Sequence, residues 1–257
     1  MTKGRVYLIG AGPGDPKLMT VRGLECMREA DVVVYDRLVN KELLSHAKKS
    51  AEIVYVGKAP GNHSIAQSEI NRILIDKAGE GKVVARLKGG DPCIFGRGGD
   101  EALALAKSGI PFEFVPGVSS AYAVPAYAGI PLTKRGLASS AAVVTGHEVD
   151  EGEVNFAALA KLGGTIVFLM GVRNLEKIAT KLMDAGLSES TPAVIICDGT
   201  LPKQREVTGK LGDIAAKAKA AGITSPAVIV IGKVVALREK LAWFEKKISN
   251  GEEGAWP

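Results

Sequence analysis

The stretch between Val83 and Glu101, which reads VVARLKGGDPCIFGRGGDE, constrains the fold of this 257-residue chain more than any other. It begins as an apolar run typical of a buried strand, and an alanine-rich helix follows from Asp100. Between them, Gly89–Pro92 and Gly96–Gly99 prevent a strand or a helix from continuing. A plain connection needs about two to six residues. This longer one, lined with Arg and Asp, indicates backbone that approaches a ligand closely, with a plain tight loop as the alternative.

Short apolar strands alternate with helices through the first half of the chain. Strands are predicted over residues 5–9, 31–35, 52–56, 83–87 and 112–115. Helices are predicted over residues 17–30, 43–49, 65–78 and 101–107, mostly from apolar residues at helical spacing. This alternation predicts an α/β fold with a parallel sheet that helices cover on both faces.

The sequence changes character at residues 116–121, PGVSSA, which predicts a hinge between two α/β domains. The first is a parallel domain over residues 1–116, and the second has a mixed sheet over residues 117–246. A loose tail is expected over residues 247–257. In the second domain, strands are predicted over 140–145, 164–171, 193–197, 204–208 and 228–231, and helices over 156–162, 175–185, 211–221 and 235–248. We expect the active site in the cleft between the two domains.

Composition excludes several classes of protein. With 46% hydrophobic and 24% charged residues the chain is globular, and no apolar run reaches the ~18 residues of a membrane span. Three distant cysteines (Cys26, Cys93 and Cys197) indicate buried thiols in a reducing cytoplasm, and three histidines without ligand spacing predict no metal site. A net charge of +5 with only 5% aromatic residues suits a substrate with several carboxylates better than nucleic acid.

A glycine-rich turn from Gly10 to Pro16 follows the first strand, and this order indicates a nucleotide-type pocket. The dinucleotide fingerprint G-x-G-x-x-G fails here, because its third glycine would fall at Asp15. Two prolines also remove N–H donors from the place where a pyrophosphate would bind. The turn therefore approaches a ligand without being built for a dinucleotide, and a purely rigid turn remains the alternative.

Several single residues have more than one reading. Asp36, after the second strand, could hold a ribose, act as a general base or cap the next helix. Lys58, after the third strand, could meet an anion, donate a proton or be simply solvated. Ser119 and Ser120 could cap the helix that follows them, and Met170 could pack in the core.

Three motifs together resemble the tetrapyrrole methylase family, and the first of them, in its full form, resembles the branch that methylates uroporphyrinogen III. They are RLKGGDPCIFGRGG, the opening GAGPGDP and the later YDRLV. The segments GKAPGNHSIAQSEIN and GIPLTKR resemble the family too, but Ala59 replaces its usual Arg and Lys134 its usual His. The resemblance runs from about Arg5 to Trp243, and the chain is expected to correspond to the stand-alone methylase rather than to a fused sirohaem synthase with its dehydrogenase–chelatase domain.

The resemblance implies a homodimeric, cytoplasmic enzyme that uses S-adenosyl-L-methionine. Two successive methylations of uroporphyrinogen III would give precorrin-2 through precorrin-1, in sirohaem or cobalamin biosynthesis. Because the sulfonium methyl is already activated, no metal or protein nucleophile is needed, only alignment, a base and cations for the carboxylates. The implied proton acceptor is Asp36 and the implied donor is Lys58.

The resemblance also implies two sets of binding residues. Those that would hold or orient the substrate are Asp15, Arg86 and Arg97. Those that would contact the cofactor are Pro13, Gly89, Gly90, Asp91, Ile94, Ser119, Ser120, Met170, Gly199 and Ala227.

Three alternatives stay open. A sister methylase that acts on a later precorrin would share the fold and cofactor and differ in product. A nicotinamide oxidoreductase is suggested by Gly10, Gly12 and Asp36, although the missing third glycine argues against it. A tetrapyrrole or nucleotide carrier would keep the cleft and show no turnover.

Overall fold

The computed structural model describes residues 4–57, 66–147, 149 and 154–244. The chain divides into two compact units, one up to Ser119 and one from Ser120, and each is considered by itself. This division lies within the hinge expected over residues 116–121, three residues after the expected boundary between 116 and 117. The predicted tail over 247–257 lies outside the described residues.

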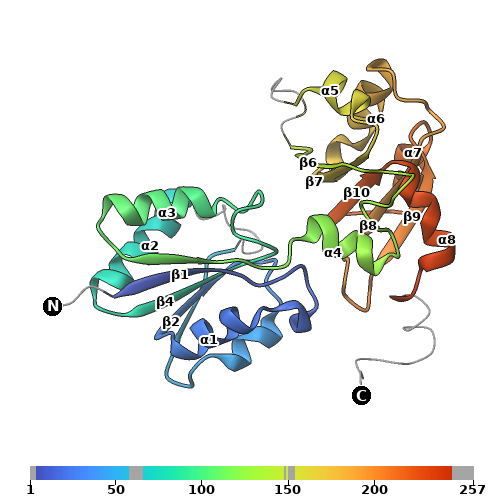
Figure 1. Cartoon of the computed structure of the whole chain (residues 1–257). Helices are drawn as coiled ribbons and strands as arrows, with labels where there is room; N and C mark the ends of the chain where they lie inside the picture. The colour runs from blue at the N-terminus through green and yellow to red at the C-terminus, as the bar shows by residue number, and fades with distance from the viewer. Residues whose placement is uncertain (1–3, 58–65, 148, 150–153, 245–257) are drawn as a thin grey trace. The chain divides into compact units, whose positions relative to one another are not determined.

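Unit 1 contains a five-stranded sheet in the order β3-β2-β4-β1-β5, and all its neighbouring strands are parallel (Figure 1). Its strands are β1 (Arg5–Gly10), β2 (Val32–Tyr35), β3 (Glu52–Tyr55), β4 (Val83–Lys88) and β5 (Phe112–Val115). Its helices are η1 (Pro16–Leu18), α1 (Val21–Glu29), η2 (Lys41–His46), α2 (Gln67–Gly79) and α3 (Gly98–Lys107). The predicted parallel sheet is confirmed, with β4 at its centre.

Helices cover both faces of this sheet, as Figure 1 shows for α1 on one side and α2 and α3 on the other. Alternate residues of each strand point to opposite faces, so every strand supplies both cores. Tyr7 and Ile9 of β1 pack with Met27 of α1, whereas Val6 and Leu8 share a cluster with residues of α2 and α3. Burial on both sides explains why the strand sequences read as continuous apolar runs.

Unit 2 contains a second five-stranded sheet in the order β6-β7-β10-β8-β9. Its strands are β6 (Ala141–Thr145), β7 (Thr165–Leu169), β8 (Pro192–Cys197), β9 (Arg205–Lys210) and β10 (Ala227–Ile231). Only β6 and β7 are parallel, and the other neighbours are antiparallel, so the predicted mixed sheet is confirmed. Its helices are α4 (Ser120–Tyr127), α5 (Phe156–Lys161), η3 (Val172–Asn174), α6 (Leu175–Asp184), α7 (Ile214–Ala220), η4 (Lys233–Leu237) and α8 (Arg238–Leu241).

Unit 2 also has a core on each face of its sheet. Phe168 and Ile229 point toward α5, α6 and α7, and Phe168 stacks on Phe156 with ring centroids 6.4 Å apart. On the opposite face, Val124 of α4 and Val234 of η4 share a cluster with the alternate strand residues.

Several element boundaries differ from the sequence predictions for local reasons. The helix predicted over 17–30 is divided, because Thr20 is extended and its hydroxyl caps the N–H of Gly23 at the start of α1. The helix predicted over 211–221 begins only at Ile214. The long helix predicted over 235–248 is wrong for the part described, since η4 and α8 end at an extended Ala242.

Two aromatic residues of that last segment contact α4 within unit 2. The ring of Tyr127 lies 5.0 Å from Trp243 and 4.9 Å from Phe244, centroid to centroid. These contacts place Trp243 and Phe244 against α4.

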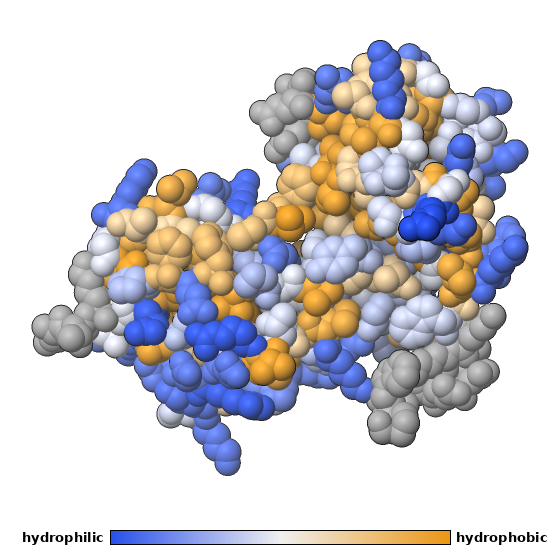
Figure 2. All heavy atoms as spheres, in the orientation of Figure 1, coloured by the Kyte–Doolittle hydropathy of each residue, from blue (hydrophilic) through white to orange (hydrophobic). Residues whose placement is uncertain are grey.

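Within the part of the chain that the structure describes, no helix has the length and apolarity needed to cross a bilayer. On the face seen in Figure 2, apolar and charged residues are interspersed over the surface of each unit.

Candidate functional site

The carboxyl ends of the parallel strands in unit 1 carry the loops that the sequence analysis singled out. Two of these loops are joined by backbone hydrogen bonds between Gly12 and Gly90. The N–H of Gly90 donates to the carbonyl of Gly12 at 2.7 Å, and the N–H of Gly12 donates to the carbonyl of Gly90 at 3.2 Å. Both glycines have positive φ values, +78° and +69°, which side-chain-bearing residues rarely adopt.

A third loop, after β5, closes onto the same point. A Cβ atom at Gly10 would lie 2.5 Å from the Cα of Gly117 and 2.7 Å from the carbonyl oxygen of Gly90. Asp91 locks this contact, because one carboxylate oxygen accepts the N–H of Gly117 at 2.9 Å and the other accepts the N–H of Cys93 at 2.7 Å. Asp91, a predicted cofactor contact, therefore already fixes the loop with both of its oxygens.

The remainder of the long loop after β4 presents an unusual backbone to the surface. Phe95 and Arg97 adopt positive φ values of 50° and 55° although neither is glycine. The side chain of Ile94, another predicted cofactor contact, is exposed beside them. Arg97 precedes α3 and is exposed, so its guanidinium is available to an anionic partner.

Cys93 corrects a prediction, because its thiol is exposed in this loop whereas Cys26 and Cys197 are buried as expected. Partial desolvation of the sulfur, and then the negative charge of Asp91, raise the pKa of the Cys93 thiol. A raised pKa disfavours the thiolate, so Cys93 is not an activated nucleophile.

Asp36 lies at the carboxyl end of β2 and caps its own turn, with one carboxylate oxygen accepting the N–H of Leu38 at 3.0 Å. Of the three roles considered for Asp36, a capping role is observed, but the carboxylate caps a turn and not a helix. Its second oxygen lies 3.4 Å from a terminal guanidinium nitrogen of Arg86. The Asp36 side chain is 27% exposed, so a ligand can still reach it.

Arg86 is a predicted substrate contact, yet its side chain is only 3% exposed. Its guanidinium donates to Glu101 at 3.2 Å and to the carbonyl of Leu87 at 2.8 Å, besides reaching Asp36. Lys88, two residues along β4 and on the same face, donates to the same oxygen of Glu101 at 2.8 Å. Burial, and next the positive charge of Arg86, lower the pKa of Lys88, while Glu101 opposes this shift.

Sequence reasoning missed the roles of Lys88 and Glu101. A signal was present, because Arg86 and Lys88 are two residues apart in an apolar strand and must point to one face. Two buried cations require a buried anion, and Glu101 in the first turn of α3 supplies it.

The loop after β1 is held by side chains of its own. Asp15 caps η1 by accepting the N–H of Lys17 at 2.9 Å, and Asn40 donates to the carbonyl of Gly14 at 2.9 Å. Pro13 lies in this loop and is half-buried. The structure thus places Asp15 and Pro13 together at the edge where β1, β2 and β4 end.

Unit 2 gathers its predicted site residues at one edge of its sheet. Met170 follows the end of β7, Gly199 follows the end of β8, and Ala227 begins the antiparallel β10 between them. The register pairs Ala227 with Cys197 and Val228 with Leu169, which brings the three positions to the same edge. Met170 is 51% exposed, so the alternative of core packing is wrong.

The backbone at this edge is strained and closely packed. Met170, Asp198 and Thr200 have positive φ values of 57°, 49° and 68°. A Cβ at Gly199 would lie 2.4 Å from a methyl group of Val124 in α4. The buried Thr200 donates its N–H to the side-chain oxygen of Gln204 at 2.8 Å, which fixes the turn.

In the described part of the chain, positive φ values at non-glycine residues occur only in the loops at these two sheet edges. Among residues 4–57, 66–147, 149 and 154–244, the non-glycine residues with positive φ are Phe95, Arg97, Met170, Asp198 and Thr200. Each such backbone costs of order 1–3 kcal/mol and persists where function or close packing requires it. Each of the two strained loop edges is therefore a candidate ligand-binding edge of its own unit.

Other predicted residues lie at the division between the units or beyond the described part. Ser119 is buried at the end of unit 1, and Ser120 is the first residue of α4. Lys58, the implied proton donor, and Ala59 lie outside the described residues. Lys134 is exposed, and its backbone bonds to Ala138 in a tight turn.

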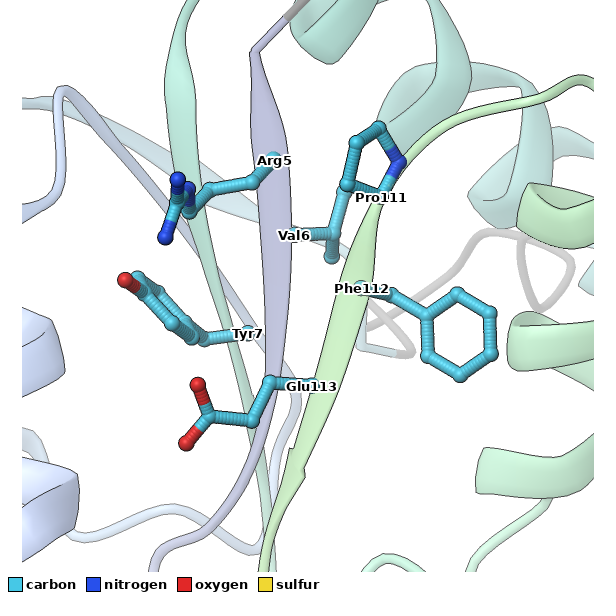
Figure 3. Close-up of a pocket in the computed structure, with 6 residues that line it drawn as sticks. All are labelled: Arg5, Val6, Tyr7, Pro111, Phe112 and Glu113. Carbon is cyan, nitrogen blue, oxygen red and sulfur yellow. The ribbon is translucent and has the colours of Figure 1, made fainter.

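A hollow in unit 1 lies away from these loops, between β1 and β5 (Figure 3). It is lined by Arg5, Val6, Tyr7, Pro111, Phe112 and Glu113. Arg5 and Pro111 lie at the amino ends of the parallel strands, whereas ligands of such sheets bind at the carboxyl ends. We therefore assign it no part in the site.

Solved structures with this fold include methyltransferases. The structure of the uroporphyrin-III C-methyltransferase of Thermus thermophilus in complex with S-adenyl homocysteine has a TM-score of 0.77 and 41% identity, covering 91% of this chain and all of that one. A cobalamin biosynthetic enzyme, cobalt precorrin-4 methyltransferase, has a TM-score of 0.79 and 32% identity over 90% of this chain and 95% of its own. The class defined by fold and site is thus a two-unit α/β methyltransferase.

The family model described as Tetrapyrrole (Corrin/Porphyrin) Methylases matches residues 5–215. The uroporphyrinogen-III C-methyltransferase of Methanocaldococcus jannaschii is 55% identical over 234 residues, which cover 90% of this chain and 97% of that protein. The chain belongs to the tetrapyrrole methylase family, which confirms the resemblance found in its motifs.

The glycine contact in unit 1 is testable by adding one methyl group. Gly10→Ala should lower the free energy of unfolding by about 1–3 kcal/mol, because the new Cβ meets backbone atoms that cannot rotate away. Gly79→Ala is the matched control, since nothing lies within 4 Å of its added Cβ. Urea denaturation measures both. Equal stability of the two variants would contradict the proposed close approach.

Proposed function

We propose that the chain is an S-adenosyl-L-methionine-dependent methyltransferase that methylates uroporphyrinogen III twice on carbon and releases precorrin-2. The observation that carries this proposal is the identity with the Methanocaldococcus jannaschii enzyme over nearly its whole length. Fold similarity alone does not select the substrate, because the cobalt precorrin-4 methyltransferase matches equally well in TM-score. That enzyme is 32% identical to this chain, against 55% for the Methanocaldococcus jannaschii enzyme, so a later precorrin is only the second candidate for the substrate.

The two strained edges suit the cofactor. In unit 1, Gly89 and Gly90 offer backbone without side chains, and a Cβ at Gly89 would already meet Leu38 at 2.6 Å. In unit 2, the exposed Met170 lies at the same sheet edge as Gly199. We assign cofactor contacts to Pro13, Gly89, Gly90, Asp91, Ile94, Ser119, Ser120, Met170, Gly199 and Ala227. When bound, S-adenosyl-L-methionine supplies an electrophilic methyl group.

The remaining chemistry falls to side chains of this chain. Methylation of a ring carbon requires loss of a proton from the macrocycle, and Asp36 is a carboxylate within reach of solvent that can accept it. The role of proton donor goes to Lys58 on the basis of the family resemblance. Arg97 and Asp15, at the same edge, would hold the substrate, with Arg97 meeting its carboxylates. We assign Arg86 an indirect part in orienting the substrate, because its buried guanidinium contacts the carboxylate of Asp36.

A direct assay tests the reaction. Incubation with S-adenosyl-L-methionine and enzymatically generated uroporphyrinogen III should add two methyl groups, read by mass spectrometry of the oxidised product. One added methyl group would stop the assignment at precorrin-1. No addition, with S-adenosylhomocysteine still bound in calorimetry, would reject this substrate and favour a later precorrin.

Replacement of Asp36 tests its role as base. Asp36→Asn should lower kcat by about 10²- to 10⁴-fold, because the amide cannot take a proton, and should change the affinity for S-adenosylhomocysteine little. The amide oxygen can still accept the N–H of Leu38, so the turn is retained. Asp76→Asn, on α2, serves as the control. A turnover number within twofold of the unmodified chain would remove Asp36 from catalysis.

We also propose that the enzyme is a cytoplasmic homodimer. The family resemblance supports the dimer, and three cysteines that form no disulfide support a reducing compartment. Light scattering coupled to gel filtration should give twice the mass of one chain. A mass equal to one chain at micromolar concentration would refute the dimer.

A further inference from the structure

We infer that Glu101 is a positioning residue for methyl transfer, one that orients the proton-accepting carboxylate of Asp36 through Arg86. This inference rests on the proposed function. Glu101 lies in the first turn of α3, where its backbone N–H donates to the carbonyl of Arg97 at 3.2 Å, and its side chain is fully buried.

The first step of the argument is the position of the cations. Arg86 and Lys88 lie on the α2 and α3 face of β4, where the register sets Arg86 beside Leu8 and Val34. The same face carries an apolar cluster from β1, β2, β4, α2 and α3. A cation there is costly unless an anion pairs with it, so Arg86 and Lys88 depend on Glu101 for their burial.

The second step is the geometry of one oxygen. The Oε1 atom of Glu101 accepts from Nε of Arg86 at 3.2 Å, from Nζ of Lys88 at 2.8 Å and from Nε2 of Gln67 at 3.3 Å. The Oε2 atom has no hydrogen-bond partner among the described residues. A buried carboxylate oxygen without a partner costs stability, so the contribution of Glu101 comes through Oε1, which holds Arg86, Lys88 and Gln67 together.

The third step is the orientation of the forked guanidinium group of Arg86. With Nε bound to Glu101 and Nη1 bound to the carbonyl of Leu87, the planar guanidinium has one orientation. In that orientation Nη2 faces Oδ2 of Asp36 at 3.4 Å. The N–H of Leu38 holds the other oxygen of Asp36, so the carboxylate is fixed from two sides. Loss of Glu101 frees the guanidinium to turn, and Asp36 then loses one of its two supports.

Glu101→Gln tests this inference. We expect kcat for the methylation of uroporphyrinogen III to fall about 10- to 100-fold, because a displacement of about 1 Å at a reacting group costs that much. The KM for S-adenosyl-L-methionine and the calorimetric Kd for S-adenosylhomocysteine should stay within twofold. Glu113→Gln is the matched control, since Glu113 also pairs with an arginine, Arg22, but on the exposed opposite face.

Arg86→Lys is the second variant, and it keeps the buried positive charge while removing the fork. It should show the same loss of kcat, and the double variant should be no slower than the slower single one, because the two residues act as a unit. If Glu101→Gln does not fold, Arg86→Lys alone decides, and a kcat equal to that of the unmodified chain overturns the inference.

Two further outcomes separate this inference from the proposed function. An unmodified chain that adds two methyl groups, with a Glu101→Gln variant of equal kcat, overturns the positioning role only. A parallel loss of kcat, S-adenosylhomocysteine affinity and melting temperature in Glu101→Gln makes Glu101 merely structural and also overturns it. An unmodified chain that methylates nothing refutes the proposed function, and the inference falls with it.

Discussion

The backbone contact between Gly10, Gly90 and Gly117 is the constraint on which unit 1 depends. It holds the loops after β1, β4 and β5 at one point, and no side chain other than hydrogen fits there. Asp91 completes it by binding the N–H of Gly117. Since β1, β4 and β5 end close to this contact, it holds their three loops together.

The strand β4 links this contact to the chemistry. β4 ends where the glycine-rich loop begins. The side chains of Arg86 and Lys88 in β4 place two positive charges on the sheet face that carries the apolar cluster beneath α3. Buried charges of this kind rarely add stability. Arg86 instead connects the buried pair with Glu101 to Asp36, so a costly buried cluster contacts the partly exposed carboxylate.

The strands and their order of alternation could be predicted, because an apolar run between turn residues needs only its neighbours in sequence. Boundaries set by capping were harder, as Thr20 shows by starting α1 later than apolar spacing alone predicts. The burial of Cys93 was predicted wrongly, since a short apolar step in sequence is exposed once the glycines around it turn the loop outward. The end of the chain was predicted as one helix, yet Ala242 is extended and Trp243 packs on Tyr127 instead.

By itself the sequence determined the parallel α/β architecture, the glycine loops and the family, because strand periodicity, turn chemistry and long motifs are local properties. Tertiary structure alone decided that Asp91 fixes a loop, that Arg86 lies behind Asp36, and that Glu101 is shared by two cations. It also decided that strain gathers at Met170 and Thr200. These facts depend on pairs of residues far apart in the chain, and only the register of the sheets and the packing of helices on them bring such residues within bonding distance.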